Sequence, residues 1–315
     1  MKKGSADGRM MKWVKKGRVA VPETPGFQHN AMVPHLVHMG SDDFVIAFAR
    51  KDMSNRSHIF LMRAVITNGS ITVDTPKLAL SPGVPGSFDC DGVLAPNFVR
   101  DGGNTYLYYG SWQNLPNKMW MMETGRAVFD PETLSLKKEF PGPVSGRSFD
   151  EPFWAGAPWV LKEGNLWRRW YVSLDRWESI GDGFRHYYCI KHRYSEDGIH
   201  WKSPAVVAIP HANEYEYAIA APCVIHVPGE LYRMWYSFRG QKDVETYRIG
   251  YAESEDGLQW QRLDHLAGIT VSDSGWDAEM VCYSRVFSHR GITYMFYNGN
   301  GYGKTGFGMA VLEEG

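Results

Sequence analysis

The fold of this chain is decided by five short segments that resemble one another: AMVPHLV (31–37), VLAPNFV (93–99), AGAPWVL (155–161), IAAPCVI (219–225) and VCYSRVF (281–287). Each segment places a proline, or in the last case a serine, between apolar residues. The aligned residues are separated by 62, 62, 64 and 62 positions, and they are Pro34, Pro96, Pro158, Pro222 and Ser284. A period of this length indicates a repeat architecture and predicts five structural units.

Three further strands are expected in each unit. An aromatic-rich run follows the aligned residue by thirteen or fourteen positions, as in VIAFAR (45–50), and a third apolar run follows it, as in YRIGYAES (247–254). The pairs Asp197-Gly198 and Asp256-Gly257 suit two-residue hairpins that lead to fourth strands near Trp201 and Trp260. The sequence therefore predicts an all-β fold, a five-bladed β-propeller of four-stranded antiparallel blades.

The two ends of the chain complement each other in this scheme. The last unit stops after its third strand, whereas KWVKKGRVAVP (12–22) supplies a strand with no unit before it. In that segment Trp13 and Pro22 are nine residues apart, as are Trp201 and Pro210. We therefore expect residues 13–21 to close the ring as the outermost strand of the last blade. Residues 11–315 are predicted to form a single domain, and residues 1–10 a disordered lead-in.

Charge and composition exclude several classes of protein. Lys and Arg number 34 against 35 Asp and Glu, so no overall field attracts nucleic acid or an anionic membrane. No run of 18 apolar residues occurs, and no apolar segment follows the basic start, so we expect neither a membrane span nor a secretory signal, and a cytoplasmic location. The four cysteines show no metal-site spacing, which predicts free thiols and neither a metal nor another cofactor.

Carboxylates are concentrated just before the aligned residues, where the first strand of each propeller blade is expected to reach the channel. Glycosidic chemistry uses two carboxylates, one as acid and one as base or nucleophile, and crowding of like charges raises the pKa of one of them. Three acids do not share one register, and they are the candidate catalytic residues, with a structural role as the alternative: Glu151, Glu216 and Glu279. Three others follow an aromatic residue in one register and are interpreted as joining the blades: Asp89, Asp150 and Asp277.

The predicted substrate-binding residues come from strand ends and from the channel mouth: His29, Arg50, Arg56, His58, Asp91, Tyr217, Arg239, Arg285, Asn300 and Lys304. Arginines offer forked donors to phosphate and carboxylate groups, so these residues predict a sugar or sugar-phosphate ligand, with ion pairs between blades as the alternative for any single arginine. Four aromatic residues are expected to stack on sugar faces: Trp154, Trp177, Tyr215 and Tyr217.

The glycine-rich segment NGNGYGKTGFG (298–308) does not match a phosphate-binding loop. The pattern GxxxxGK[ST] requires glycine where Asn298 stands, and a helix must follow, whereas FGMAVLE (307–313) is typical of a strand. We expect instead a hairpin over the channel mouth, with Asn300 and Lys304 pointing inward.

Several phrases resemble known proteins. APNFVRDGGNTYLYYGS (95–111) and YRIGYAESEDGLQW (247–260) resemble the five-bladed propeller superfamily of glycoside hydrolase families 43, 32, 68 and 130, and the likeness covers nearly the whole chain. More closely, HNAMVPHLV (29–37), NEYEYAI (213–219) and GWDAEMVCYSRVF (275–287) are similar to a bacterial glycosyl hydrolase-like group often linked with surface-polysaccharide gene clusters. The resemblance implies a propeller that acts on or binds sugars inside the cell.

The chain departs from these families at the residue before each blade proline. Family 43 hydrolases place an acidic residue there, and family 130 phosphorylases have Glu-Asp-Pro. The corresponding residues here are Val33, Ala95, Ala157, Ala221 and Tyr283. No catalytic residue of those families is therefore carried over, because fold is shared more widely than reaction.

The leading hypothesis from the sequence is a carbohydrate-active enzyme that hydrolyses or transfers a glycosyl unit in bacterial polysaccharide metabolism. In that hypothesis the substrate occupies the axial pocket, and two of the three candidate glutamates act as acid and base. The alternative is a non-catalytic carbohydrate-binding propeller, supported by the missing carboxylates. A third hypothesis, a protein-interaction scaffold, requires no pocket lined by charged residues.

Overall fold

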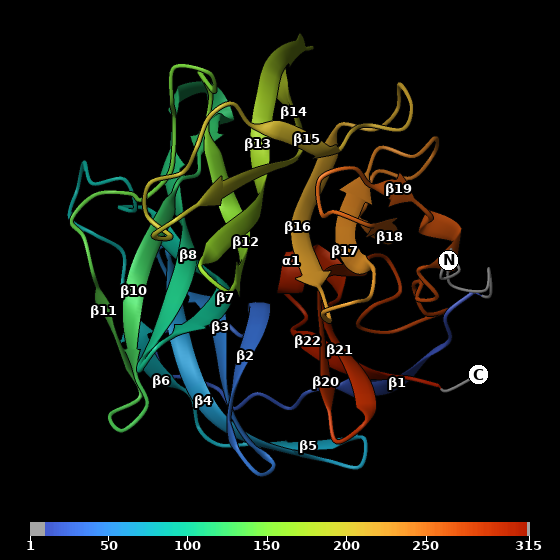
Figure 1. Ribbon diagram of the computed structural model, residues 1–315. Helices are drawn as coiled ribbons and strands as arrows, with labels where there is room; N and C mark the ends of the chain where they lie inside the picture. The colour runs from blue at the N-terminus through green and yellow to red at the C-terminus, as the bar shows by residue number, and fades with distance from the viewer. Residues whose placement is uncertain (1–9, 314–315) are drawn as a thin grey trace.

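The structure, a computed structural model, describes residues 10–313 and shows an all-β protein built from several antiparallel sheets (Figure 1). Apart from Met10, the predicted lead-in lies outside the described residues. No helix within residues 10–313 is long and apolar enough to cross a membrane.

The first three groups of antiparallel strands each begin with a strand that contains an aligned proline. The first contains β2 (Met32–Gly40), β3 (Asp43–Lys51) and β4 (Ser57–Thr67), with β5 (Ser70–Val73) and β6 (Lys77–Leu80) both paired to β4. The second contains β7 (Gly92–Asp101), β8 (Asn104–Asn114), β10 (Thr124–Asp130) and β11 (Ser135–Lys138), and the short β9 (Trp120–Met121) pairs with β8. The third contains β12 (Ala155–Glu163), β13 (Leu166–Ile180), β14 (Gly183–Ser195) and β15 (Val206–Ile209).

The remaining strands complete the described chain. One group contains β16 (Ala218–Ile225), β17 (Tyr232–Arg239), β18 (Arg248–Ser254) and β19 (Gln261–Arg262). The last sheet contains β20 (Cys282–His289), β21 (Ile292–Asn298), β22 (Phe307–Leu312) and β1 (Trp13–Arg18), with the helical turn α1 (Asn300–Gly303) between β21 and β22. β1 pairs antiparallel with β22, so strands from the two ends of the chain lie side by side (Figure 1).

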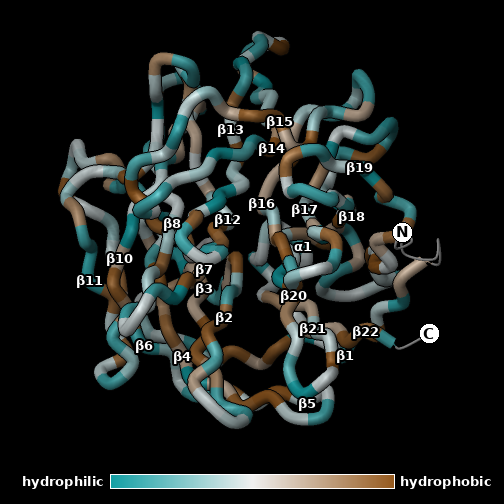
Figure 2. The backbone as a smooth tube through the Cα atoms, in the orientation of Figure 1, coloured by the Kyte–Doolittle hydropathy of each residue, from teal (hydrophilic) through white to brown (hydrophobic). Residues whose placement is uncertain are grey.

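Residues of high hydropathy lie mainly along the strands, whereas the connecting loops are more hydrophilic (Figure 2). Aromatic residues fill much of the interior; Phe48, Phe60 and Phe296 are fully buried. Trp13 of β1 packs edge-on against Trp235 of β17 and donates its indole N–H to the Ala267 carbonyl at 3.1 Å. Buried aromatic rings of this size contribute strongly to core stability, and here one of them links β1 to the preceding group.

The innermost strand of each group is bent at the same place. Register shifts that interrupt the antiparallel pairing occur in β2, β7, β12, β16 and β20. At four of these bulges the residue before the aligned proline or serine has φ between 46° and 56°: Val33, Ala157, Ala221 and Tyr283. This left-handed conformation is unfavourable for a residue with a side chain, most of all for β-branched Val33. Bulges redirect side chains, and here they turn the strand toward the pocket described below.

The two Asp-Gly pairs differ from the sequence-based expectation. They do not form two-residue hairpins, because ten residues separate β14 from β15, and six separate β18 from β19. The Asp197 carboxylate accepts hydrogen bonds from the N–H groups of Ile199 and His200, and Asp256 does the same for Leu258 and Gln259. Each Asp-Gly pair therefore lies in a longer loop, whose turn is stabilised by hydrogen bonds to the aspartate side chain.

A buried ion pair links β1 to the loop before β20. The Lys15 ammonium lies 2.7 Å from the Asp277 carboxylate, whose side chain is 3% exposed, and the Tyr297 hydroxyl donates to the same oxygen at 3.0 Å. Asp277→Ala is expected to lower the free energy of unfolding by about 2–3 kcal/mol, because removing one partner leaves the other charge partly buried and unpaired. Urea unfolding followed by tryptophan fluorescence measures this change.

Lys12→Ala is the matched control, because the Lys12–Glu313 pair is 74% and 47% exposed and exposed pairs contribute less than ~1 kcal/mol. Equal losses in the two variants would contradict a special role for the Lys15–Asp277 pair.

His35 and His192 are buried in an uncharged form. Burial, with the positive charges of Arg168 and Arg169, lowers the pKa of His192 to about 3, and burial lowers the pKa of His35 well below its ordinary value. The unfolded chain therefore binds more protons than the folded chain as the pH falls below the ordinary histidine pKa of ~6.5. Folding stability is fully present above that pH and is lost progressively as the pH falls toward 3.

His192→Phe is expected to reduce this loss by up to about 1.4 kcal/mol per pH unit between pH 6 and pH 4, because it removes one titrating group. The same replacement at exposed His265 serves as the control. Unfolding free energies measured from pH 7 to pH 4 give the slope, and an unchanged slope in His192→Phe would refute the interpretation.

Candidate functional site

A cavity of about 260 Å³ lies where the inner strands converge. Its wall contains the four residues with positive φ at the bulges: Val33, Ala157, Ala221 and Tyr283. The rest of the wall comes mainly from second and third strands and from the loops beside them. The volume matches a single small ligand, slightly below the ~300–1,000 Å³ typical of small-molecule sites.

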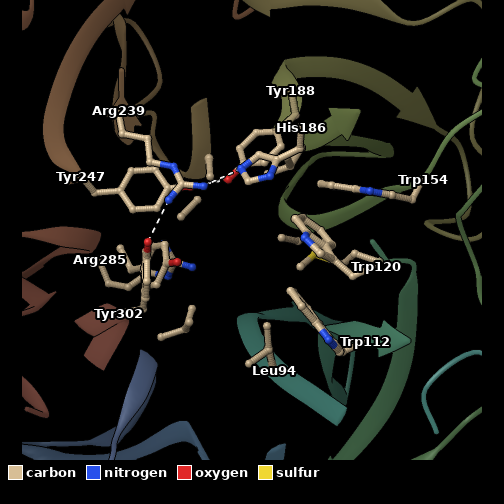
Figure 3. A pocket seen from close by; sticks show the side chains of 17 residues that line it. Leu94, Trp112, Trp120, Trp154, His186, Tyr188, Arg239, Tyr247, Arg285 and Tyr302 are labelled. Atoms are coloured by element: carbon tan, nitrogen blue, oxygen red, sulfur yellow. Dashed lines mark hydrogen bonds between the residues drawn. The ribbon is translucent and has the colours of Figure 1, made fainter. Parts of the chain in front are cut away.

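One side of the pocket is a row of three indole rings (Figure 3). Trp112 at the end of β8 stacks on Trp120 of β9, with ring centres 4.5 Å apart and planes inclined by 15°. Trp120 in turn lies 4.3 Å from Trp154, which precedes β12. The short β9 pairs with β8 and so holds Trp120 in this row. The stacked rings form an apolar aromatic wall, and the apolar side of a sugar ring can pack against such a wall.

The other side of the pocket carries Arg239, at the end of β17, with aromatic rings around its guanidinium (Figure 3). The guanidinium carbon lies 4.9 Å from the ring centre of Tyr217 and 5.0 Å from that of Tyr247. One guanidinium nitrogen donates to the Tyr302 hydroxyl at 2.8 Å, and another donates to Nε2 of His186. Cation–π contacts and these two hydrogen bonds fix the side chain in place.

His186 accepts that hydrogen bond because it is uncharged. Burial, with the positive charges of Arg239 and Arg185, lowers the pKa of His186 to about 3. Its ring also stacks on Tyr188, whose hydroxyl bonds that of Tyr247. The extended hairpin of β13 and β14 brings His186 and Tyr188 to the pocket.

Arg285 of β20 is the second arginine on the wall. It is 4% exposed, lies 5.4 Å from the ring centre of Trp159 and donates to the carbonyl of Ser284. Burial lowers the pKa of Arg285 to about 10, so it still carries its charge at neutral pH. Among the described residues, neither Arg239 nor Arg285 forms an ion pair with a carboxylate, and no acidic residue lines the pocket.

Two of the candidate catalytic glutamates are buried away from this pocket. Glu151 accepts hydrogen bonds from Tyr171 at 2.7 Å and Ser173 at 2.6 Å, and it pairs with Arg193 at 2.9 Å. Glu216 forms a forked pair with Arg262, both distances being 2.8 Å. These bonds occupy both oxygens of each carboxylate.

The same arrangement recurs at the acids interpreted as structural. Asp89 accepts from Tyr109 and pairs with Lys138, as Asp277 does with Tyr297 and Lys15. Asp150 instead shares Arg193 with its neighbour Glu151. Glu151 therefore has the repeat position of Asp89 and Asp277, which the sequence analysis gave to Asp150 because Asp150 follows an aromatic residue.

The third candidate glutamate and the glycine-rich segment lie near the rim. Glu279 is exposed, and its backbone N–H donates to the Asn300 side chain at 2.8 Å. The expected hairpin is instead the short turn α1, in which Tyr302 is the residue that reaches the pocket, and Lys304, which follows the turn, is exposed. The catalytic assignment of the three glutamates stays a prediction, but none of them lines the cavity.

The remaining predicted binding residues are engaged elsewhere. Exposed His29 pairs with Glu23, and Arg56 and His58 both contact Asp52. Arg50 is buried and donates to the carbonyls of Asn30 and Pro22, and Asp91 accepts from the N–H of Asn114. Of the ten predicted residues, Arg239 and Arg285 line the pocket. Tyr217 does not line it, but its ring contacts the Arg239 guanidinium.

Several wall residues escaped the sequence analysis: Trp112, Trp120, His186, Tyr188, Tyr247 and Tyr302. They lie on second and third strands or on loops, whereas the search concentrated on residues before the first strands. The aromatic cluster WQNLPNKMW (112–120) was a visible signal. Among the aromatic residues that were predicted to stack, Trp154 lines the pocket and Trp177 packs edge-on against Trp120.

No cluster of three or more potential metal ligands occurs among residues 10–313. The four cysteines are free thiols, three of them buried.

Known structures share this fold at low sequence identity. A glycoside hydrolase superposes with a TM-score of 0.75 at 15% identity, over 96% of this chain and 92% of that one. A structure from a study of the GH130 family, on mannoside phosphorylases and on hydrolases of β-1,2 mannosidic linkages in Candida mannan, gives a TM-score of 0.69 at 15% identity, over 99% and 96% of the two chains. The chain therefore shares the architecture of the propeller glycoside hydrolases, as its sequence phrases suggested.

No protein-family model matches the chain. Two proteins of Mycobacterium tuberculosis are much more similar in sequence. Uncharacterized protein MT1551, from strain CDC 1551 / Oshkosh, is 37% identical over 307 residues, and Uncharacterized protein Rv1502, from strain ATCC 25618 / H37Rv, is 36% identical over 307 residues. Each alignment covers 96% of this chain and the whole of the relative. The chain belongs to the family of these two mycobacterial proteins.

Proposed function

We propose that the strand groups are the blades of a five-bladed propeller, closed by β1 as the outer strand of the last blade. The 62-residue spacing of the aligned residues supports the count, and the pairing of β1 with β22 supports the closure. A cytoplasmic location and a role in bacterial polysaccharide metabolism stay predictions from the sequence.

We further propose that the protein recognises a sugar in the central pocket without hydrolysing it by a carboxylate pair. The observation that carries this proposal is the wall at the bulges. Val33, Ala157, Ala221 and Tyr283 place apolar or phenolic side chains on the cavity, whereas the resemblance to families 43 and 130 implies an acidic residue before a blade proline. Acid–base cleavage of a glycosidic bond requires carboxyl groups within reach of that bond.

The pocket nevertheless keeps the features of a sugar site. The indole row offers an apolar aromatic wall, and tyrosine hydroxyls and arginine N–H groups offer hydrogen bonds on the facing side (Figure 3). This combination of an aromatic platform and a few convergent polar groups is typical of small-molecule sites. The shared architecture with glycoside hydrolases supports a carbohydrate as the ligand.

Trp120→Ala is expected to weaken binding of a sugar ligand roughly ten- to thirtyfold, because it removes the middle ring of the stacking platform. Tyr194→Ala, which removes an aromatic ring 48% exposed on β14, is the control and is expected to leave affinity unchanged. Calorimetry and tryptophan fluorescence with neutral and acidic mono- and disaccharides provide the measurement, after a thermal-shift screen selects the ligands that bind.

Product analysis of the same mixtures tests the rival hypothesis of an enzyme. The proposal predicts saturable binding with no cleaved or transferred sugar. Turnover that falls ~10²–10⁴-fold in Glu151→Gln, Glu216→Gln or Glu279→Gln would overturn it and establish the acid–base mechanism predicted from the sequence. Folding of each variant is checked by its thermal transition, because Glu151 and Glu216 are buried.

A further inference from the structure

We propose that the ligand of this pocket is an anionic sugar, whose carboxylate or phosphate group binds between Arg239 and Arg285. This inference rests on the proposed sugar site and specifies its ligand class. It follows from two guanidinium groups that share one small apolar cavity and have no carboxylate partner among the described residues.

Arg239 has N–H donors that no described residue accepts. Its guanidinium carries five N–H bonds, and the described residues accept only those toward Tyr302 and His186. Its Nε is buried and has no hydrogen-bond partner. A buried donor without an acceptor costs stability, so an incoming anionic oxygen would relieve that cost. The ring contacts of Tyr217 and Tyr247 hold the guanidinium in place before the ligand arrives.

The neighbours of Arg239 favour an anion over a neutral hydroxyl group. Uncharged His186 accepts from the guanidinium and neutralises none of its charge. The Tyr302 hydroxyl accepts one Arg239 N–H, which leaves its own proton available for a ligand oxygen. Charge-assisted bonds from a forked guanidinium to two oxygens are stronger than neutral ones, and both carboxylate and phosphate present that geometry.

Arg285 adds a second positive charge to the same wall. It is almost fully buried, and its Nε also lacks a partner among the described residues. Burial of an unpaired charge is unfavourable, as its lowered pKa of about 10 reflects. A bound anion would compensate both arginines at once.

The other buried arginines are compensated in different ways: Arg126 and Arg193 pair with carboxylates, whereas Arg50 has no ion pair among the described residues and donates to the carbonyls of Asn30 and Pro22. Arg193 and Arg262 each contact two carboxylates. Arg169 is also buried without an ion pair, but it lies between the rings of Tyr171 and Trp201 and does not line the cavity. What distinguishes Arg239 and Arg285 is that they are unpaired and face a space large enough for a ligand.

The test compares matched sugars that differ in one charge. Glucuronate and galacturonate are titrated beside glucose and galactose, and glucose 6-phosphate and inorganic phosphate complete the series. We expect the anionic sugars to bind at least tenfold more tightly than the neutral ones. A preference for the uronates identifies a carboxylate, and a preference for glucose 6-phosphate identifies a phosphate group.

Arg239→Gln is expected to weaken binding of the anionic sugars roughly ten- to hundredfold, while Arg239→Lys restores part of the affinity. Arg63→Gln, a change of the same charge at an exposed position of β4, is the control and is expected to have no effect. Thermal transitions of all variants show whether each remains folded, and Arg285→Lys provides a second variant at the same wall.

The outcomes separate this inference from the function on which it rests. Equal affinity for charged and neutral sugars, unchanged by Arg239→Gln, would overturn the anionic ligand and leave the sugar site standing. Binding of inorganic phosphate that depends on Arg239, with no binding of any sugar, would overturn the sugar site and leave an anion site. Failure of every probe to bind would count against both.

Discussion

A buried carboxylate that bonds a tyrosine hydroxyl and a cation fixes the loop before the inner strand in several groups of this fold. Asp89, Glu151 and Asp277 each accept from a tyrosine twenty residues further along and pair with Lys138, Arg193 and Lys15. Each carboxylate is desolvated, so it needs these partners to stay charged. By fixing the loop, the bonds hold the start of the following bent strand.

The bend of each inner strand determines the chemistry of the pocket. At the bulges the chain adopts a left-handed conformation that costs free energy at Val33 and the alanines, and the neighbouring groups compensate with specific bonds. Thus the Asn298 side chain accepts the N–H of Val33, and the Ser237 hydroxyl accepts the N–H of Tyr283, both at 2.8 Å. The chain shares its overall architecture with the glycoside hydrolases. The residues placed on it differ, and with them the expected reaction.

Two of the glutamates that were predicted to be catalytic form ion pairs inside the fold, whereas two arginines line the pocket. In the described chain Glu151 and Glu216 are consumed by internal ion pairs, while Arg239 and Arg285 line the cavity without such partners. The pocket is therefore positive, apolar and aromatic. Two arginines without an ion pair among the described residues and an aromatic wall are the basis for proposing recognition of an anionic sugar.

The sequence by itself determined the repeat and the all-β class, because a period of about 62 residues and alternating strands are local properties of the chain. It also identified Arg239, Arg285 and Trp154, since these stand at strand ends or beside the aligned segments. The sequence also showed that the residues before the blade prolines differ from the acidic residues that the resemblance to hydrolase families implies.

Only the tertiary structure decided which polar residues face the cavity. A carboxylate and an arginine at equivalent strand ends look alike in sequence, and their roles depend on which partner lies across the sheet. Glu151 meets Arg193 on the third strand of its own group, whereas Arg239 meets tyrosines that lie just before β16, just before β18 and in α1. The indole row likewise depends on β9 folding back on β8, a contact between irregular segments that no periodic pattern predicts. The sequence repeat suggests candidate residues, and long-range packing determines which of them line the pocket.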